Sequence, residues 1–145
     1  SWKSFSDKFA SDKSLNLKDF DKIFSLTNCD IFNVQYGIVE DEINSFNNTT
    51  KNKLLTIEGL DLYNNFEDIA SLLKSLDIFI SVSNSTAHLA GALGVQTILI
   101  KPENFAVFHY WNQKTDNTPW YPSVRLIDKK KFLNDTKFLK NILGT

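Results

Sequence analysis

Residues 80–94, which read ISVSNSTAHLAGALG, pass from β-branched residues through small polar residues to alanines and leucines. The apolar run over 78–82 is typical of a buried strand, and residues 85–93 have the composition of a helix that ends at a glycine. Residues 83–84 predict the turn between them, and Ser85 is a suitable helix N-cap. The stretch therefore predicts a strand, a turn and a helix in direct succession.

The same alternation of strands and helices continues on both sides of this stretch. Residues 44–52, rich in Asn and Thr, predict a loop. Strands that alternate with helices form right-handed βαβ units, whose parallel sheet is covered on both faces. We therefore predict an α/β fold with a doubly wound, mainly parallel sheet. The periodicities predict further helices over 17–27, 66–76 and 132–143, and further strands over 31–36, 54–57, 95–100 and 124–127.

Length and composition restrict the class of protein. A chain of 145 residues with 42% hydrophobic residues can bury one core, so we predict a single domain over 1–145. The net charge of −1 provides no basic surface for nucleic acid. Apolar runs stay well short of the roughly 20 residues that a membrane span requires, so we expect a cytoplasmic protein. Cys29 is the only cysteine, and we expect it to be a small buried side chain.

The first residues of the sequence are also informative. The sequence contains no methionine and opens on Ser1, Trp2 and Lys3. An initiator Met could have been removed before a small Ser. We favour the alternative, that the sequence is the excised end of a longer protein.

A doubly wound sheet predicts where a ligand binds. In such sheets, ligands bind beyond the carboxyl ends of the strands, and the turn after Val82 lies at that edge. The helix start at Ser85 offers free N–H groups and the positive end of a dipole, which suit an anion such as a diphosphate. His88, in the first helical turn, can donate a ring N–H to a phosphoryl or sugar oxygen. The alternative for His88 is a histidine hydrogen-bonded within the helix packing.

Two segments resemble a known enzyme family. Residues 77–100, DIFISVSNSTAHLAGALGVQTILI, followed by TPWYPSVRLI over 118–127, resemble the C-terminal half of GT-B glycosyltransferases. The similarity is closest to bacterial tetratricopeptide-linked glycosyltransferase-like proteins and more distant to family 9 ADP-heptose:lipopolysaccharide heptosyltransferases. Residues 1–4 also match the end of the first strand of that half. The resemblance implies a Rossmann-like domain that binds a nucleotide diphosphate sugar without a metal or another cofactor.

The resemblance also implies a set of residues that bind the donor diphosphate. Ser83 and Asn84 stand where heptosyltransferase-like enzymes have Asp-Thr, so an acidic group that arranges the donor is absent. Ser4 and Lys13 stand where those enzymes place hydroxyl and basic residues on the phosphates, although Lys3 and Lys8 compete with Lys13. The implied diphosphate site consists of Ser4, Lys13, Ser83, Asn84, Ser85, Thr86, His88 and Lys101, the last because it follows its strand directly.

Aromatic residues predict the rim of the pocket. Gln35 and Tyr36 end a strand at the position where the family places the nucleotide base, and a turn with an aromatic plug explains them equally well. Trp120 and Tyr121 belong to a Pro-containing turn that the resemblance places at the rim of the donor pocket. The alternative is that the aromatics of this region, like most, pack a core or a loop; they are Phe105, Phe108, Tyr110, Trp111, Trp120 and Tyr121.

The resemblance divides the chemistry between two halves of a longer protein. Sugar transfer requires a stabilised leaving diphosphate, a deprotonated acceptor hydroxyl and exclusion of water. The resemblance places the acceptor and the base in an N-terminal half, so we assign no catalytic residue here and expect the isolated chain to bind the donor and transfer little. Apolar surface exposed by the loss of that half predicts self-association. The alternative is a non-catalytic nucleotide-binding or interaction module.

Overall fold

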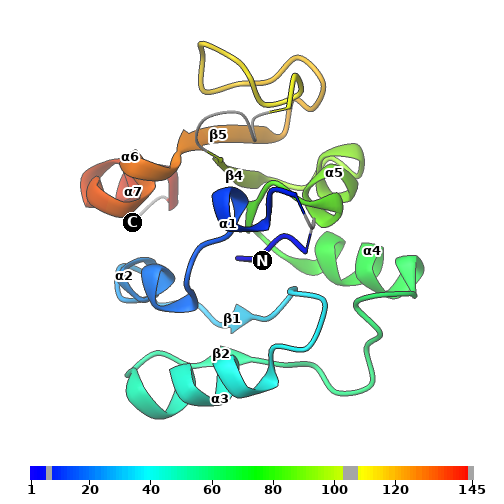
Figure 1. Ribbon diagram of the computed structural model, residues 1–145, viewed down its shortest axis with the longest axis vertical. Coiled ribbons are helices and arrows are strands. Elements are labelled where there is room, and N and C mark those ends of the chain that lie inside the picture. Colours follow the sequence, from blue (N-terminus) through cyan, green and yellow to red (C-terminus); the bar gives the residue numbers. More distant parts are fainter. Residues whose placement is uncertain (6–7, 103–107, 144–145) are drawn as a thin grey trace.

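The computed structural model describes residues 1–5, 8–102 and 108–143. Two parallel sheets are flanked by helices, which confirms the predicted α/β class (Figure 1). The smaller sheet pairs β1 (Ile31–Phe32) with β2 (Leu54–Leu55). The larger sheet has the order β3-β4-β5, with β3 at Phe79–Val82, β4 at Thr97–Lys101 and β5 at Val124–Asp128.

Helices cover both sides of the larger sheet. Figure 1 shows α4 and α5 on one side and α6 and α7 on the other, with α3 beside the smaller sheet. This two-sided cover is what right-handed crossovers between parallel strands produce. The helices are α1 (Ala10–Lys13), the 3₁₀ helix η1 (Leu17–Phe20), α2 (Asp21–Phe24), α3 (Glu40–Thr49), α4 (Phe66–Ser75), α5 (Ser85–Ala92), α6 (Lys129–Asn134) and α7 (Thr136–Leu143).

Residues 1–5 run in an extended conformation between the two sheets (Figure 1). The nitrogen of Ser1 donates to the carbonyl oxygen of Ile80 at 2.8 Å, and the N–H of Val82 donates to the carbonyl oxygen of Ser1 at 3.0 Å. These are the alternating bonds of a parallel strand pair. The segment therefore takes the place of a strand next to β3.

The Gln35 side chain attaches the same segment to the smaller sheet. Its Oε1 accepts the N–H groups of Trp2 and Lys3 at 2.8 and 2.7 Å. The order across the molecule is thus β2, β1, the N-terminal segment, β3, β4 and β5. This is the strand order of doubly wound nucleotide-binding folds. The chain adds strands on one side of the N-terminal segment first, as β1 and β2, and then on its other side, as β3, β4 and β5.

One apolar cluster contains side chains from both sheets. Leu54 of the smaller sheet belongs to the same cluster as Val82 and Ile100 of the larger sheet. Phe46 of α3 and Phe132 of α6 lie in this cluster from opposite ends. A second cluster packs α4 and α5 against the other face. Burial of these faces is the main stabilising contribution to the arrangement.

The prediction of a loop over residues 44–52 is wrong, because α3 extends through most of this range. Ile43 and Phe46, three residues apart, are buried on one face of this helix. The acidic residues 40–42 occupy its first turn, where the helix dipole favours negative charge. Burial of two apolar side chains therefore outweighs the low helix propensity of Asn and Thr.

Other boundaries differ for local reasons. The predicted helix over 132–143 is two helices that meet at Asp135, whose carboxylate accepts the N–H of Phe138 at 2.8 Å and so caps the second helix. The predicted helix over 17–27 is a 3₁₀ turn followed by one α-helical turn. Cys29 is exposed, which corrects its expected burial.

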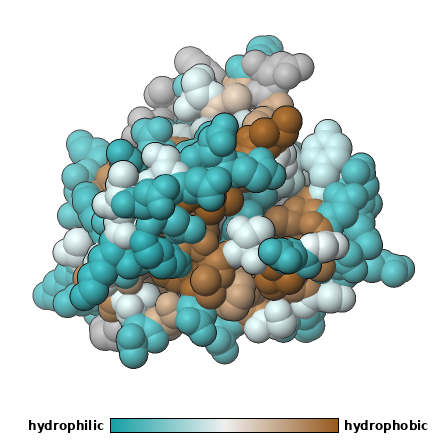
Figure 2. Space-filling model, turned by 90° about the horizontal axis from the view of Figure 1, so that it is seen from below, coloured by the Kyte–Doolittle hydropathy of each residue, from teal (hydrophilic) through white to brown (hydrophobic). Residues whose placement is uncertain are grey.

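Hydrophobic residues also reach the surface. Figure 2 views the molecule from the side of β2 and α3 and shows hydrophobic residues in the middle of this face. Large exposed hydrophobic residues in this part of the chain include Ile38, Leu55 and Ile57. Self-association through such surface stays a prediction. Within the described ranges, no helix combines the length and the hydropathy needed to cross a bilayer.

Substitution of Gln35 tests the connection between the sheets. Gln35→Ala leaves the N–H groups of Trp2 and Lys3 without their acceptor, and Gln35 is only 1% exposed. We expect the free energy of unfolding, measured by urea denaturation, to fall by about 3 kcal/mol. The matched control is Gln96→Ala at an exposed position, for which we expect a change within about 0.5 kcal/mol. Equal effects of the two substitutions would contradict this account.

Candidate ligand-binding site

A cavity of about 610 Å³ opens at the carboxyl ends of the N-terminal segment and β3. These two elements flank the point where the strand order reverses, which is where doubly wound folds bind ligands. Its lining comes from segments that are far apart in sequence. The lining residues are Ser4, Phe5, Lys13, Tyr36, Leu62, Tyr63, Phe66, Ile69, Ser83, Asn84, Ser85, Thr86, His88, Leu89 and Phe108.

The N-terminus of α5 forms one wall of this cavity. Asn84, not Ser85 as predicted, is the N-cap: its Oδ1 accepts the N–H of Ala87 at 3.0 Å. Asn84 can do this because its backbone is extended, with φ −147° and ψ 179°. Among the described residues, none accepts a hydrogen bond from the N–H of Ser85 or Thr86. Two amides at the positive end of the helix dipole therefore remain beside the cavity.

Ser83 and Asn84 use their polar side-chain atoms within the protein. The hydroxyl of Ser83 accepts the indole N–H of Trp111 at 3.1 Å. The Asn84 amide donates to the Ser1 hydroxyl at 2.8 Å and to the carbonyl oxygen of Lys3 at 3.2 Å. Both residues line the cavity, and their hydrogen bonds also hold the loop in place. Their contact with a diphosphate stays a prediction.

Lys13 supplies positive charge next to the helix start. It is only 5% exposed, although it lines the cavity. Its Nζ lies 4.1 Å from the ring centroid of Phe108, a cation–π contact. Burial lowers the pKa of Lys13. Within the described part of the chain, no carboxylate lies within ion-pair distance of its ammonium group and none lines the cavity.

His88 is packed among aromatic side chains and also lines the cavity. Its Nδ1 lies 3.1 Å from the hydroxyl of Tyr121. Its ring also packs against Trp111, with 4.7 Å between centroids. Burial, and then the nearby charge of Lys13, hold the pKa of His88 below its usual value. The imidazole is thus anchored on one side and faces the cavity, and its contact with a ligand stays a prediction.

A cluster of aromatic side chains forms another part of the cavity lining. The ring of Tyr36 lies 5.4 Å from that of Phe5 and 6.0 Å from that of Tyr63. Tyr63 and Phe66 are 68% and 65% exposed. The sequence analysis predicted a helix over 66–76 and assigned no ligand role to Phe5, Tyr63 or Phe66. The available signal for Tyr63 and Phe66 was their position just before and at the start of the helix that follows β2.

Gln35 and Lys101 lie outside the lining. Gln35 directs its side chain inward, toward the N-terminal segment, and so cannot form the predicted pocket rim. Lys101 pairs with Asp128 of the neighbouring strand at 3.0 Å. This ion pair holds the ammonium group away from the cavity lining, which corrects its predicted role on a diphosphate.

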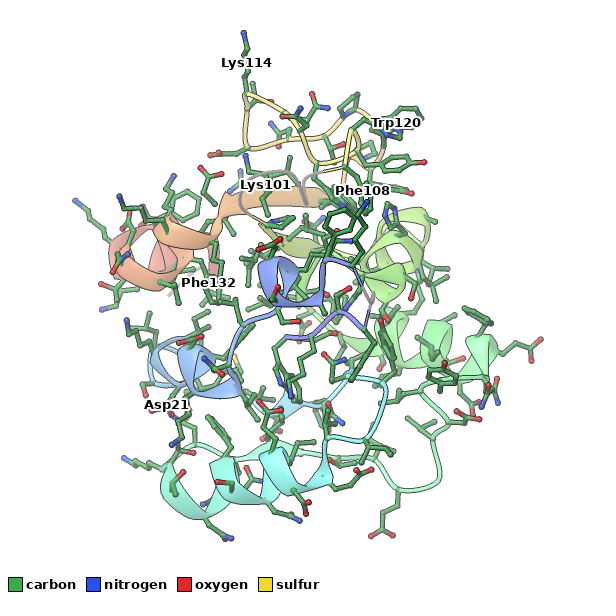
Figure 3. All side chains as sticks on the ribbon, in the orientation of Figure 1. Asp21, Lys101, Phe108, Lys114, Trp120 and Phe132 are labelled. Carbon is green, nitrogen blue, oxygen red and sulfur yellow. The ribbon has the colours of Figure 1, made fainter. Side chains whose placement is uncertain are left out.

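Trp120 and Tyr121 are also absent from the lining. Trp120 is 54% exposed, and Figure 3 shows it on the outer side of the loop before β5, whereas Phe108 lies beside α1. Tyr121 packs against Gly91, where an added Cβ would lie 2.6 Å from its ring. Tyr121 therefore does not line the cavity, and its hydroxyl contacts the Nδ1 of His88, which does. Phe105 falls outside the described residues.

Comparisons with known proteins give one relative. The chain is 35% identical over 94 residues to Protein FlbA of Caulobacter vibrioides, and the match covers 64% of this chain and 15% of FlbA. The chain thus spans less than a sixth of the length of the curated relative it matches. No family model and no solved structure matches.

The predicted assignment to the GT-B glycosyltransferases is therefore wrong. The relative is FlbA, whose name describes no glycosyltransferase, and neither a family nor a structural neighbour supports the assignment. The quoted motif has a physical explanation without that family. Its small residues let the turn pack closely, while Ser83 and Asn84 satisfy hydrogen bonds of the fold itself. A strand, a small-residue turn and a helix recur in many doubly wound proteins.

Removal of the Lys13 charge tests the electrostatics of the cavity. Because that charge lowers the pKa of His88, we expect Lys13→Gln to raise it. The measurement is an NMR titration of the imidazole protons, which is simple because the chain has only two histidines. Lys18→Gln, at an exposed position, serves as the control and should leave the titration unchanged. An unchanged pKa in both variants would place Lys13 away from the imidazole.

Proposed function

We propose that the cavity binds a nucleotide diphosphate, alone or joined to a sugar. The diphosphate lies at the start of α5 and the base lies against the aromatic side. One observation carries this proposal: a single cavity joins a cationic wall, a helix N-terminus and an aromatic wall. A nucleotide diphosphate presents two charged groups and a flat ring, so its chemistry fits both walls.

The cationic wall favours an anion over a neutral ligand. Lys13, His88 and the amides of Ser85 and Thr86 line the same side of the cavity. Charge-assisted hydrogen bonds to phosphate oxygens are roughly twice as strong as neutral ones. Burial of Lys13 without a carboxylate partner among the described residues costs free energy, and a bound anion would offset that cost. The free site is therefore electrostatically prepared for negative charge.

The aromatic wall favours a ligand with a planar ring. Stacking of a base on an aromatic side chain contributes about 1–3 kcal/mol. Tyr63 and Phe66 are exposed next to the cavity and Tyr36 lies between Phe5 and Tyr63, so flat apolar surface is available without unfolding. The volume of about 610 Å³ lies within the range of roughly 300–1,000 Å³ that small-molecule sites occupy.

The proposed role of the cavity residues by themselves is to bind the nucleotide diphosphate, and not to transfer a sugar. The described lining offers no carboxylate that could deprotonate an acceptor hydroxyl, and His88 already contacts Tyr121 through one ring nitrogen. This favours a nucleotide-binding module over a self-sufficient transferase. Activity of a longer protein would need groups from outside this chain.

Calorimetric titration tests the proposal. We expect ADP, UDP or GDP, or one of their sugar conjugates, to bind, and the corresponding nucleoside without phosphate to bind at least about tenfold more weakly. Lys13→Gln should weaken binding of the diphosphate about tenfold or more, whereas Lys18→Gln should not change it. Binding that is equal for nucleoside and diphosphate, or insensitive to Lys13, contradicts the cationic wall.

The affinity for the diphosphate should depend on pH. The pKa of His88 is lowered in the free protein, and a bound anion raises it because the anion stabilises the imidazolium. Binding therefore takes up a proton between the two pKa values, so affinity should fall as pH rises from about 5 to about 8. Titrations across this range measure the effect, and His88→Gln should flatten the profile. A profile that is equally steep in His88→Gln assigns the proton to another group.

A further inference from the structure

A second cavity lies between the two sheets, at the amino ends of their strands. Its volume is about 420 Å³. Phe32 and Val34 contribute to it from the side of β1, and Ile78 and Ile80 from the side of β3. Ser1 and Trp2 close it at the end nearest the ligand cavity. The cavity therefore lies where the N-terminal segment would extend if the chain continued backwards from Ser1.

Backbone groups of both strands face this cavity. Asn33 donates to Leu55, and Phe79 donates to Gln96, so these residues point toward the outer strands. Because successive residues of a strand point their hydrogen-bonding groups to alternate sides, Phe32 and Ile80 face the gap. By the registers of the two ladders, the N–H groups of Phe32 and Ile80 point away from β2 and β4, and among the described residues neither makes a bond outside those ladders. Both strands thus present a free N–H group to the gap, whereas the carbonyl oxygen of Ile80 already accepts from Ser1.

The N-terminal segment indicates how wide the gap is. The N-terminal segment already bridges it, with direct bonds to β3 and bonds through Gln35 on the side of β1. Adjacent strands lie about 4.8 Å apart, so two edges that both reach one intervening segment leave room for one strand. Beyond Ser1, no described segment fills that position.

We propose that this cavity is a strand slot, occupied by an extended apolar segment that is joined to Ser1 in a longer polypeptide. The segment runs parallel to β1 and β3. The nitrogen of Ser1 already donates to Ile80 as a strand amide does, and residues 1–3 already lead out of the slot in the parallel direction. In that polypeptide the Ser1 nitrogen is a neutral peptide N–H, so its burial against Ile80 no longer carries the desolvation cost of a buried ammonium group.

The lining defines the chemistry of the occupant. Phe20 and Phe24 line the slot from one face of the sheet and Leu76 from the other. A strand covered on both faces is a nearly continuous apolar run, rich in Val and Ile. At a rise of about 3.3 Å per residue, about three residues pair alongside 78–80. The filled slot joins the two sheets into one, independently of any ligand.

Short extensions fused before Ser1 test the proposal. We expect Val-Ile-Val-Ile to raise the urea midpoint of unfolding and to slow hydrogen exchange at the Phe32 and Ile80 amides at least about tenfold. Gly-Ser-Gly-Ser, of the same length, should do neither. Val-Pro-Val-Pro should also fail, because proline cannot donate to a ladder. A Val-Thr-Val-Thr extension repeats the test with less apolar surface, should the first extension aggregate.

Two outcomes overturn the proposal. Equal exchange rates with the apolar and the Gly-Ser extensions show that no strand enters the slot. Light scattering tests the other occupant: an unextended chain that is a dimer and whose Phe32 and Ile80 amides are already protected assigns the slot to a second copy. A monomer whose Phe32 and Ile80 amides become protected only by the extensions that can pair supports the strand slot.

Discussion

Two side-chain carboxamides hold the centre of this protein together. Gln35 accepts two N–H groups of the N-terminal segment, and Asn84 donates to its Ser1 hydroxyl and its Lys3 carbonyl group. Buried backbone groups must be paired, and neither sheet offers a complete edge to this segment. The carboxamides complete the pairing, so the order of strands and the position of both cavities depend on them.

Periodicity was sufficient for the elements whose apolar residues decide their structure. The run over 78–82 and the helical spacing of 66–76 gave β3 and α4 within two residues. It failed at α3, where only Ile43 and Phe46 are buried and the remaining residues are polar. Burial of two residues against a neighbouring sheet is a tertiary effect, so no local pattern contained it.

The candidate site was predicted in part for the same reason. The switch-point rule located the cavity, since it needs only the alternation of strands and helices. Which side chains face the cavity depends on hydrogen bonds that the sequence does not display. Gln35 was expected to meet a ligand and instead supports the backbone, whereas Phe66, predicted only as part of a helix, lies at the cavity. The family resemblance failed because small residues around a strand–helix turn serve close packing in many proteins.

The N-terminal segment belongs to both cavities, because Ser1 borders the strand slot and Phe5 borders the ligand cavity. The ring of Phe5 rests against Gly37, which has φ +90° and leaves no space for a side chain there. One short stretch thus borders both cavities. By thermodynamic reciprocity, any factor by which a filled slot changes the affinity for a ligand equals the factor by which that ligand changes the filling of the slot.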